Sequence, residues 1–219
     1  MRTDSITVHD KRITAYHESG HVLAYYLCGY ASLVTEVGLG RPSSLKDTDR
    51  APKNISGYTG GNCPNPFEFR RFNRSKSVAL VDNYMLVMLG GTIAEITMAH
   101  TLEQSSNDFE RLGEYLGEHN IPKERTQRIL MAGITKFEIY QSVLYALAGA
   151  LIKRKRLGDE EIATIVSQDI SVHSLKRLRR KSIDSIALQM HKGGASFREI
   201  GGFFGIDERI VAKAIKGTL

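Results

Sequence analysis

The stretch that most constrains the fold of this 219-residue chain is His17-Glu18-Ser19-Gly20-His21, in which two histidines stand four positions apart. On an α-helix, residues four apart share one face, with Cβ atoms roughly 5–6 Å apart, so His17 and His21 can bind one Zn²⁺ from a single turn. Glu18 lies on the flank of that face, where its carboxylate can take a proton from a metal-activated water. The alternative is a helix with two ordinary surface or core histidines. The pattern therefore predicts a helix and, given a third ligand, a catalytic zinc site.

Two histidines leave a catalytic zinc one protein ligand short. No other histidine stands in a recognisable ligand motif, which leaves two carboxylates as the better candidates. Asp108 is predicted in the first turn of a helix, where backbone and capping groups can fix the direction of a carboxylate. Glu95 follows the Gly90-Gly91 pair by one turn, in a predicted helix that can pack on the histidine helix. The spacing of these residues leaves both carboxylates open as the third ligand.

The composition favours a cytoplasmic globular protein. A hydrophobic share of 42% and a charged share of 25% are ordinary for that class, and the length suffices for one mid-sized domain and a small one. The first twelve residues carry charges where a signal peptide needs an apolar core, and the longest apolar run, 77–99, is interrupted by polar residues, so no membrane segment is predicted. Cys28 and Cys63 form no CxxC pair, which argues against disulfides and a thiolate zinc site.

Hydrophobic periodicity predicts a body that is mainly α-helical with one small β-sheet. Gly29 is the expected stop of the histidine helix, and the Gly90-Gly91 pair is expected inside a long helix, where close packing has to offset roughly 1 kcal/mol per glycine. Asn107 is the expected N-cap of the helix that carries Asp108, with Glu110 completing a near capping box. Helices are predicted over residues 10–27, 75–99, 107 onward, 124–156 and 159–166, strands over 33–39 and 55–59 with the second ended by Gly60-Gly61, and a polar loop over 41–54.

Several of these segments, in this order, resemble the zinc peptidase domain of the FtsH-type membrane AAA proteases. The likeness covers about Lys11 to Ser167 and extends well beyond the histidine pair. Ala15 to His21 resembles the AxHExGH helix, Val34-Thr35 and Gly57-Tyr58-Thr59 are similar to the strand pair, Gly90 to Glu95 resembles GGRxAE with Thr92 in place of the usual Arg, Ser106 to Arg111 resembles SNDxER, and Leu144 to Ile162 is similar to the late helices.

This resemblance implies an FtsH-peptidase-like helical zinc domain and a metalloendopeptidase activity. Proteolysis, as opposed to another zinc-dependent hydrolysis, follows from the resemblance and not from the histidine pair. The alternatives are that Asp108 is an ordinary helix-start aspartate and that Glu95 is a solvated helix residue. The resemblance assigns His17, His21 and Asp108 to zinc, Glu18 to the general base, Glu95 to orienting a metal ligand, and Gly57, Tyr58 and Thr59 to binding an extended polypeptide substrate.

The chain departs from the family in carrying no GxxxxGK[ST] loop and no predicted membrane helix. We therefore expect the substrate to be a flexible or unfolded protein segment, or a separate unfoldase to supply the mechanical work. Family members assemble into hexameric rings partly through their ATPase, so a homo-oligomer stays an open expectation for this chain.

The charge distribution predicts two modules, at residues 1–168 and 169–219. From Gln168 onward ten Lys/Arg face five Asp/Glu, whereas the preceding part carries twenty against nineteen, so most of the net charge of +6 lies in the second module. A basic amphipathic helix is expected over Leu175–Lys181, continuing through Ile183, Ile186, Ala187 and Met190. The segment 196–215, with Ser196 capping and Glu199 at N3, resembles a trihelical helix-turn-helix whose small core is expected to contain Ile206, Ile210 and Ile215.

The basic tail makes DNA a candidate partner of the second module. Acidic residues at the start of its last helix, Asp207 and Glu208, would repel phosphate, and the alternative is a packing or oligomerisation module with a solvated basic face. A DNA-binding regulator that uses the first module as a sensor, or a protease directed to a repressor, is thus the alternative function. Its candidate DNA contacts are Lys176, Arg177, Arg179, Arg180, Arg209 and Lys213.

Overall fold

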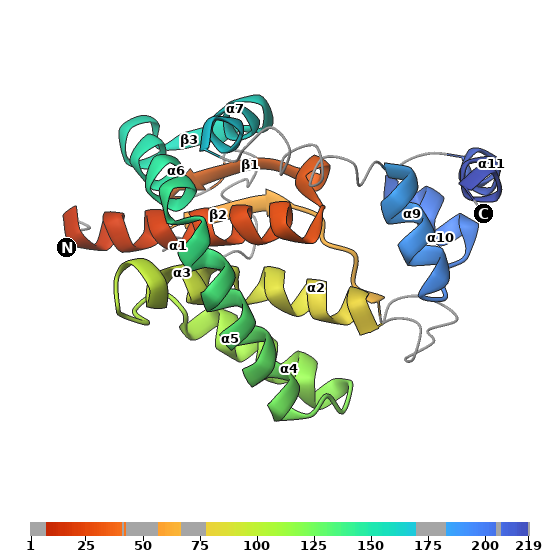
Figure 1. Ribbon diagram of the computed structural model, residues 1–219, viewed down its shortest axis with the longest axis horizontal. Coiled ribbons are helices and arrows are strands. Elements are labelled where there is room, and N and C mark those ends of the chain that lie inside the picture. Colours follow the sequence, from red (N-terminus) through yellow and green to blue (C-terminus); the bar gives the residue numbers. More distant parts are fainter. Residues whose placement is uncertain are drawn as a thin grey trace, which may run out of the picture.

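The computed structural model describes residues 8–40, 42, 57–66, 78–169, 183–204 and 207–218. These residues form a mainly helical protein with a small three-stranded antiparallel sheet, which confirms the coarse prediction of a mainly α body with one small sheet (Figure 1). The elements in chain order are α1 (Val8–Cys28), a 3₁₀ turn (Ala31–Leu33), β1 (Val34–Leu39), β2 (Gly57–Gly61), α2 (Val78–Met88), α3 (Gly90–Met98), α4 (Ser106–Glu118), α5 (Lys123–Ile139), α6 (Gln141–Arg154), β3 (Arg156–Gly158), α7 (Asp159–Asp169), α9 (Ile183–Lys192), α10 (Phe197–Phe204) and α11 (Glu208–Thr218).

Helix α1 lies at the centre of the fold. The sheet covers one side of it, α2 and α3 lie on the other side, and α6 crosses near its N-terminal half (Figure 1). Ala15 and Leu23 are fully buried, as expected for a helix with neighbours on several faces. The helix ends where predicted, because Gly29 adopts a left-handed φ of 77° that terminates the helical hydrogen bonding.

Helices α1 and α3 meet through their backbones. A Cβ atom on Gly20 would lie 2.2 Å from the carbonyl oxygen of Gly90, and a Cβ on Gly90 would lie 2.7 Å from the carbonyl oxygen of Gly20. The prediction of one long helix over 75–99 is wrong, because α2 and α3 meet at a 54° bend next to Leu89. The glycine pair therefore begins α3. The close packing expected around this pair is its contact with α1, the helix that carries the two histidines.

The sheet has the strand order β2-β1-β3. Val37 is its central residue, paired with Thr59 of β2 on one side and with Leu157 of β3 on the other. The predicted strand over 33–39 is confirmed as β1. The predicted end of the second strand is wrong, since Gly60-Gly61 continue β2.

Strand β3 was not predicted. The helical pattern over 124–156 divides into α5 and α6, and α6 ends at Arg154 because Lys155 adopts a left-handed φ of 66°. Arg156–Gly158 then pairs with β1. Three residues contain too little alternation to signal a strand, and pairing with β1 determines their conformation.

The start of α4 also differs from the prediction. The residue at its N-cap is Ser105 and not Asn107, and it makes no side-chain cap hydrogen bond. The Ser105 hydroxyl instead donates to the Glu95 carboxylate, at 2.7 Å. The Ser105 hydroxyl is thus hydrogen-bonded to the buried Glu95 carboxylate and does not cap α4.

Helices α9, α10 and α11 form the predicted three-helix arrangement, of which Leu175–Lys181 and Ile206 lie outside the described residues. The predicted capping box is confirmed: the Ser196 N–H donates to Glu199 Oε2 at 2.7 Å, and the Glu199 N–H donates to Ser196 Oγ at 3.2 Å. The placement of Ile210 in the core is wrong. It is 60% exposed, whereas Val211 and Ile215, four positions apart, face inward with Met190 and Ile200.

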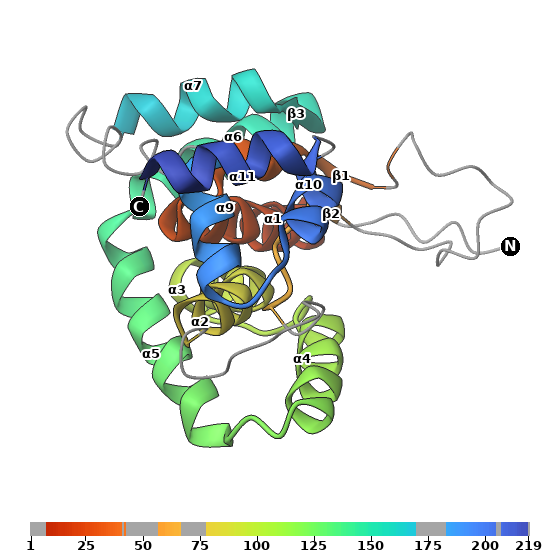
Figure 2. The same cartoon turned by 90° about the vertical axis from the view of Figure 1, so that its right-hand side faces the viewer.

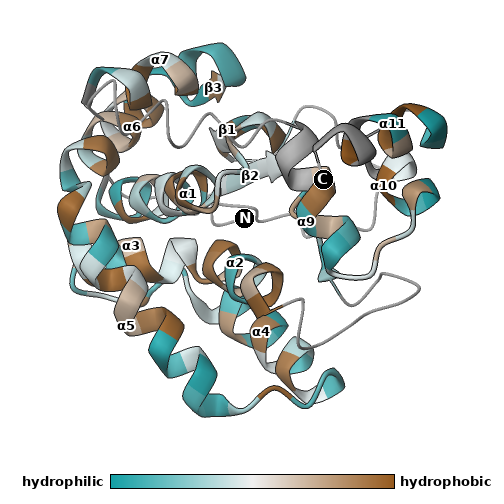
Figure 3. Ribbon diagram, turned by 45° about the vertical axis from the view of Figure 1, so that its right-hand side comes forward, coloured by the Kyte–Doolittle hydropathy of each residue, from teal (hydrophilic) through white to brown (hydrophobic). Residues whose placement is uncertain are grey.

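Within the described ranges no single helix is long and apolar enough to cross a membrane. Helices α2 and α3 reach that length and apolarity only when taken together across their bend, and their apolar residues are largely buried. Figure 3 shows hydrophobic residues in both helices, with paler and hydrophilic residues between them.

Candidate metal centre

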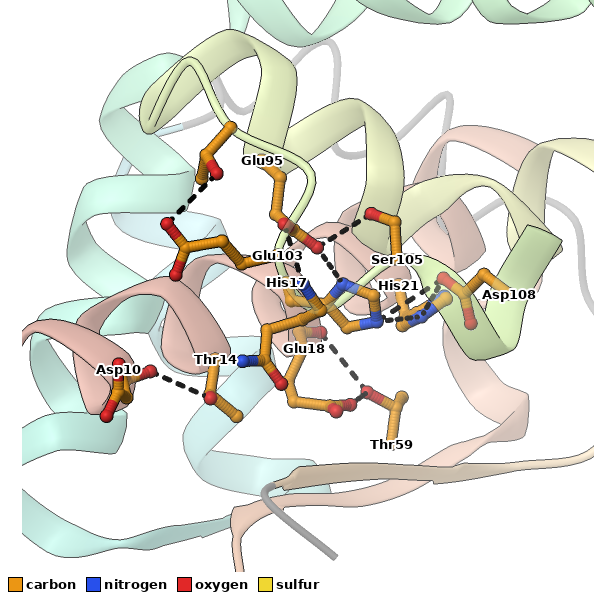
Figure 4. A network of polar contacts seen from close by, with 12 residues as sticks. Asp10, Thr14, His17, Glu18, His21, Thr59, Glu95, Glu103, Ser105 and Asp108 are labelled. Carbon is orange, nitrogen blue, oxygen red and sulfur yellow. Dashed lines mark hydrogen bonds and ion pairs between the residues drawn. The ribbon is translucent and has the colours of Figure 1, made fainter. Parts of the chain in front are cut away.

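Three ligand atoms converge beside α1. His17 Nε2 and His21 Nε2 lie 3.2 Å apart, and each lies 3.3 Å from Asp108 Oδ2 in the first turn of α4 (Figure 4). His17 is buried, and His21 and Asp108 are partly buried. This group could hold a metal ion, and it joins the two predicted histidines to one of the two carboxylates that the spacing had left open.

The hydrogen bonds around the imidazoles fit a metal. His21 Nδ1 lies 2.8 Å from the Val87 carbonyl oxygen, which can only accept, so Nδ1 carries a proton and, in the neutral imidazole, Nε2 has the lone pair. His17 Nδ1 likewise faces a carboxylate oxygen of Glu95 at 2.7 Å. Asp108 Oδ2 is buried without a hydrogen-bond partner among the described residues. With both Nδ1 atoms engaged, the two Nε2 atoms and the Asp108 carboxylate can face one shared cation, either a metal ion or a proton.

The spacing of the three atoms fits a tetrahedral ion of the size of zinc. Metal–ligand bonds of about 2.0–2.1 Å in a tetrahedron place neighbouring ligand atoms about 3.3 Å apart. Without a metal, a proton takes this place: burial works to lower the pKa of His21, but the facing Asp108 carboxylate, with Glu18 and the Val87 carbonyl, raises it to about 9. Burial would raise the pKa of Asp108, and the histidines hold it below its ordinary value.

Glu18 lies directly beside the ligand group and is only 6% exposed. Its Oε2 is 2.8 Å from the Thr59 hydroxyl, which also lies 3.2 Å from the backbone oxygen of Glu18 (Figure 4). A Cβ on Gly57 would come within 2.7 Å of Glu18 Cγ, so β2 leaves room for this side chain only because residue 57 is glycine. Burial raises the pKa of Glu18, which makes the carboxylate a better proton acceptor near neutral pH.

Glu95 is fully buried and ties three segments together. Its Oε1 accepts from His17 Nδ1 and from the Ser105 hydroxyl, both at 2.7 Å, and its Oε2 accepts from the Gln104 N–H at 3.0 Å. Gln104 and Ser105 directly precede α4, the helix that carries Asp108. Glu95 thus contacts a metal-site histidine and the entry to the carboxylate helix, while its own oxygens lie outside the ligand group.

The predicted substrate residues divide between the two faces of β2. Gly57 and Thr59 face Glu18, whereas the Tyr58 ring lies against Gly38 and 6.0 Å from the Arg156 guanidinium. Burial raises the pKa of Tyr58. Of the three predicted substrate residues, Gly57 and Thr59 therefore lie at the site and Tyr58 does not. Strand β2 is an edge strand of the described sheet.

Three contributors to the site were missed from the sequence. A Cβ on Gly91 would lie 2.4 Å from the His17 ring, so Gly91 gives the imidazole its place, and the Gly90-Gly91 pair was the available signal. The Ser105 hydroxyl and the Val87 carbonyl have no signal of their own, because a backbone carbonyl is present at every residue and serine is common at helix starts.

Two of the six candidate DNA contacts, Arg209 and Lys213, lie in the described part of the chain, four positions apart on α11. Arg209 is exposed, but its guanidinium binds both carboxylate oxygens of Asp207, each at 3.1 Å. Lys213 is exposed on α11. Lys176, Arg177, Arg179 and Arg180 lie outside the described residues.

No protein-family model and no curated protein sequence matches the chain. The site is therefore characterised by its own geometry.

Proposed function

We propose that the protein is a zinc-dependent metalloendopeptidase with an FtsH-peptidase-like domain, and that it cleaves flexible or unfolded polypeptide segments. The observation that carries the proposal is the convergence of His17 Nε2, His21 Nε2 and Asp108 Oδ2 within 3.2–3.3 Å of one another, with both Nδ1 atoms already engaged. Two histidines and one carboxylate are a ligand set of catalytic zinc sites, which leave a fourth position for water or substrate.

Zinc held by these three residues would supply a Lewis acid for a substrate carbonyl and for water. Glu18 is the proposed proton acceptor and later donates that proton to the leaving amine. Its burial and raised pKa support this role, and the Thr59 hydroxyl holds the carboxylate in one orientation. Glu95 is a positioning residue in this proposal, because it keeps the proton on Nδ1 of His17 and leaves Nε2 free.

Strand β2 supports the choice of an extended polypeptide as the substrate. Its pairing with β1 uses one edge, and the same strand presents Gly57 and Thr59 to Glu18. A peptide added along the other edge would align its backbone beside the proposed proton acceptor.

Metal content and proteolysis, measured together, test the proposal. Protein loaded with zinc and then dialysed should retain about one zinc per chain and cleave casein, an unfolded substrate. Glu18→Gln should keep the zinc and lose cleavage by a factor of about 10²–10⁴. Asp108→Ala should lose the zinc. Unchanged cleavage in the Glu18→Gln variant would show that the peptidase assignment is wrong.

The alternative function, a DNA-binding regulator, rests on the three helices α9, α10 and α11 and on the basic composition of the chain from Gln168 onward. Salt-sensitive binding of the full chain to duplex DNA, lost after deletion of residues 171–219, would support it. Absence of such binding in the full chain would remove it.

A further inference from the structure

A groove of about 580 Å³ runs between α2 and α5, away from the metal centre. Leu86 of α2 and Ile129 of α5 form its apolar floor. A Cβ on Gly133 would lie 2.5 Å from Ile93 Cδ1, so this glycine lets α5 lie close against the helices beneath it. We call this feature the basic groove because of the charges on its α5 side.

Two cations of the basic groove are available to a ligand. Arg125 is already engaged, since its Nε lies 2.7 Å from Asp82 and its guanidinium donates to the Val78 carbonyl at 2.9 Å. Arg128 and Lys136 are exposed, and within the described residues neither has a carboxylate within ion-pair distance. They are eight residues apart, which places them about 12 Å apart along α5. That separation is too large for one phosphate, so a matching ligand carries two negative groups about two helical turns apart.

Helix α4 presents such a pattern. Glu110, Glu114 and Glu118 are exposed and stand four residues apart, so the outer two are also about 12 Å apart. Beside them, Gly113 and Gly117 have open space around their Cα atoms, which allows another surface to approach the helix backbone closely.

The acidic face of α4 cannot enter the groove of its own chain. Helix α4 packs on α2 through its opposite face, with the Tyr115 ring 4.9 Å from that of Tyr84. Figure 2 shows α4 and α5 on opposite sides of α2. The complementary surface must therefore come from another molecule.

We propose that a second copy of this chain places the acidic face of α4 in the basic groove, with Glu110 and Glu118 opposite Arg128 and Lys136. The two surfaces differ, so the contact is head-to-tail, and repetition gives a closed ring or an open chain of subunits. The helix held in this way carries Asp108 and buries only Leu112 and Tyr115 within its own chain, so the neighbouring copy supports the helix that contributes the carboxylate of the metal site.

Charge reversal on each surface tests this contact. Arg128→Glu with Lys136→Glu changes the groove, and Glu110→Lys with Glu118→Lys changes α4. Sedimentation velocity at low salt should show concentration-dependent association of the wild-type chain, weakened at least about tenfold in each double variant because like charges then face each other. An equimolar mixture of the two double variants should associate again, since each then offers the other an opposite charge.

The matched control reverses Lys153 on α6 and Glu160 on α7, both exposed and outside the two surfaces, and should associate like the wild type. Circular dichroism and zinc content establish that each variant is folded. A wild-type chain that stays monomeric at low salt and high micromolar concentration, a double variant that associates like the wild type, or a mixture that does not recover association would each overturn the proposal.

Discussion

Replacing Glu95 by Gln tests the connection between the buried carboxylate and the metal site. The change keeps the shape of the side chain and removes its charge and one acceptor atom. If the amide oxygen occupies the position that receives His17 and Ser105, the amide NH₂ must face the N–H of Gln104, which is also a donor. One buried hydrogen bond becomes a contact between two donors, and the bond to His17 loses its ionic character.

The magnitude follows from these two losses. A hydrogen bond to a charged group contributes about 1.5–3 kcal/mol, against about 0.5–1.5 kcal/mol for a neutral pair. Loss of the group that orients a metal-binding histidine weakens metal affinity about 10- to 100-fold. We therefore expect Glu95→Gln to raise the zinc Kd by that factor. The unpaired donor should also lower the unfolding free energy of the metal-free protein by about 1–3 kcal/mol.

Competition with a chromophoric chelator at fixed pH measures the zinc affinity, and urea unfolding in the presence of EDTA measures the stability. Glu103→Gln is the matched control, because this carboxylate precedes α4 on the same loop but its side chain is 48% exposed. Among the described residues its polar partners are Thr101 and, at 3.9 Å, His9. A zinc affinity within twofold of the wild type in Glu95→Gln would refute the orienting role. An equal loss of zinc affinity in Glu103→Gln would show that the effect comes from the change in net charge and not from the contact with His17.

Further predictions concern the space and the protons around the site. Gly91→Ala places a methyl group 2.4 Å from the His17 ring, so it should destabilise the protein by about 1–3 kcal/mol and weaken zinc binding. Urea unfolding and chelator competition measure the two effects. The control Gly149→Ala, with open space on α6, should instead stabilise the protein by about 0.5–1 kcal/mol. Because the facing Asp108 raises the pKa of His21 to about 9, the metal-free site holds a proton at pH 7.5, so zinc uptake should release about one proton, measured by calorimetry in buffers of different ionisation enthalpy. For the same reason zinc affinity should increase with pH from about 6.5 to about 9, because less of the bound proton then has to be displaced.

The histidine pair and the central helix could be predicted from the sequence because the information is local. Spacing of four residues determines which side chains share a helical face, and Gly29 determines where the helix ends. The residues alone left Asp108 and Glu95 open as the third ligand, and only the resemblance to the SNDxER segment favoured Asp108. The role of Val87 could not, since only its carbonyl takes part and its side chain carries no trace of that role.

The errors in the predicted elements have a different cause. Helical periodicity continues on both sides of Leu89, and the Gly90-Gly91 pair that follows it fits a bend as well as a straight helix under close packing. In α11, Ile210 and Val211 are equally apolar neighbours, and only the packing of the three helices decides which faces inward. Strand β3 exists through its pairing with β1. In each case tertiary contact decides between conformations that the local sequence permits.

The glycines at the α1–α3 crossing show how the local sequence and a tertiary contact together position the site. Gly20 lies inside the histidine stretch, where the metal chemistry places no demand on it, yet its backbone touches Gly90. This contact brings α3 closer to α1 than side-chain packing allows, since helices usually pack with axes 8–10 Å apart. The close approach lets Gly91 lie against the His17 ring and lets the short Glu95 side chain reach His17 Nδ1. The same carboxylate then holds the residues that lead into α4, and α4 presents Asp108 to both histidines. The position of the third ligand therefore depends on a backbone contact within the stretch that supplies the first two.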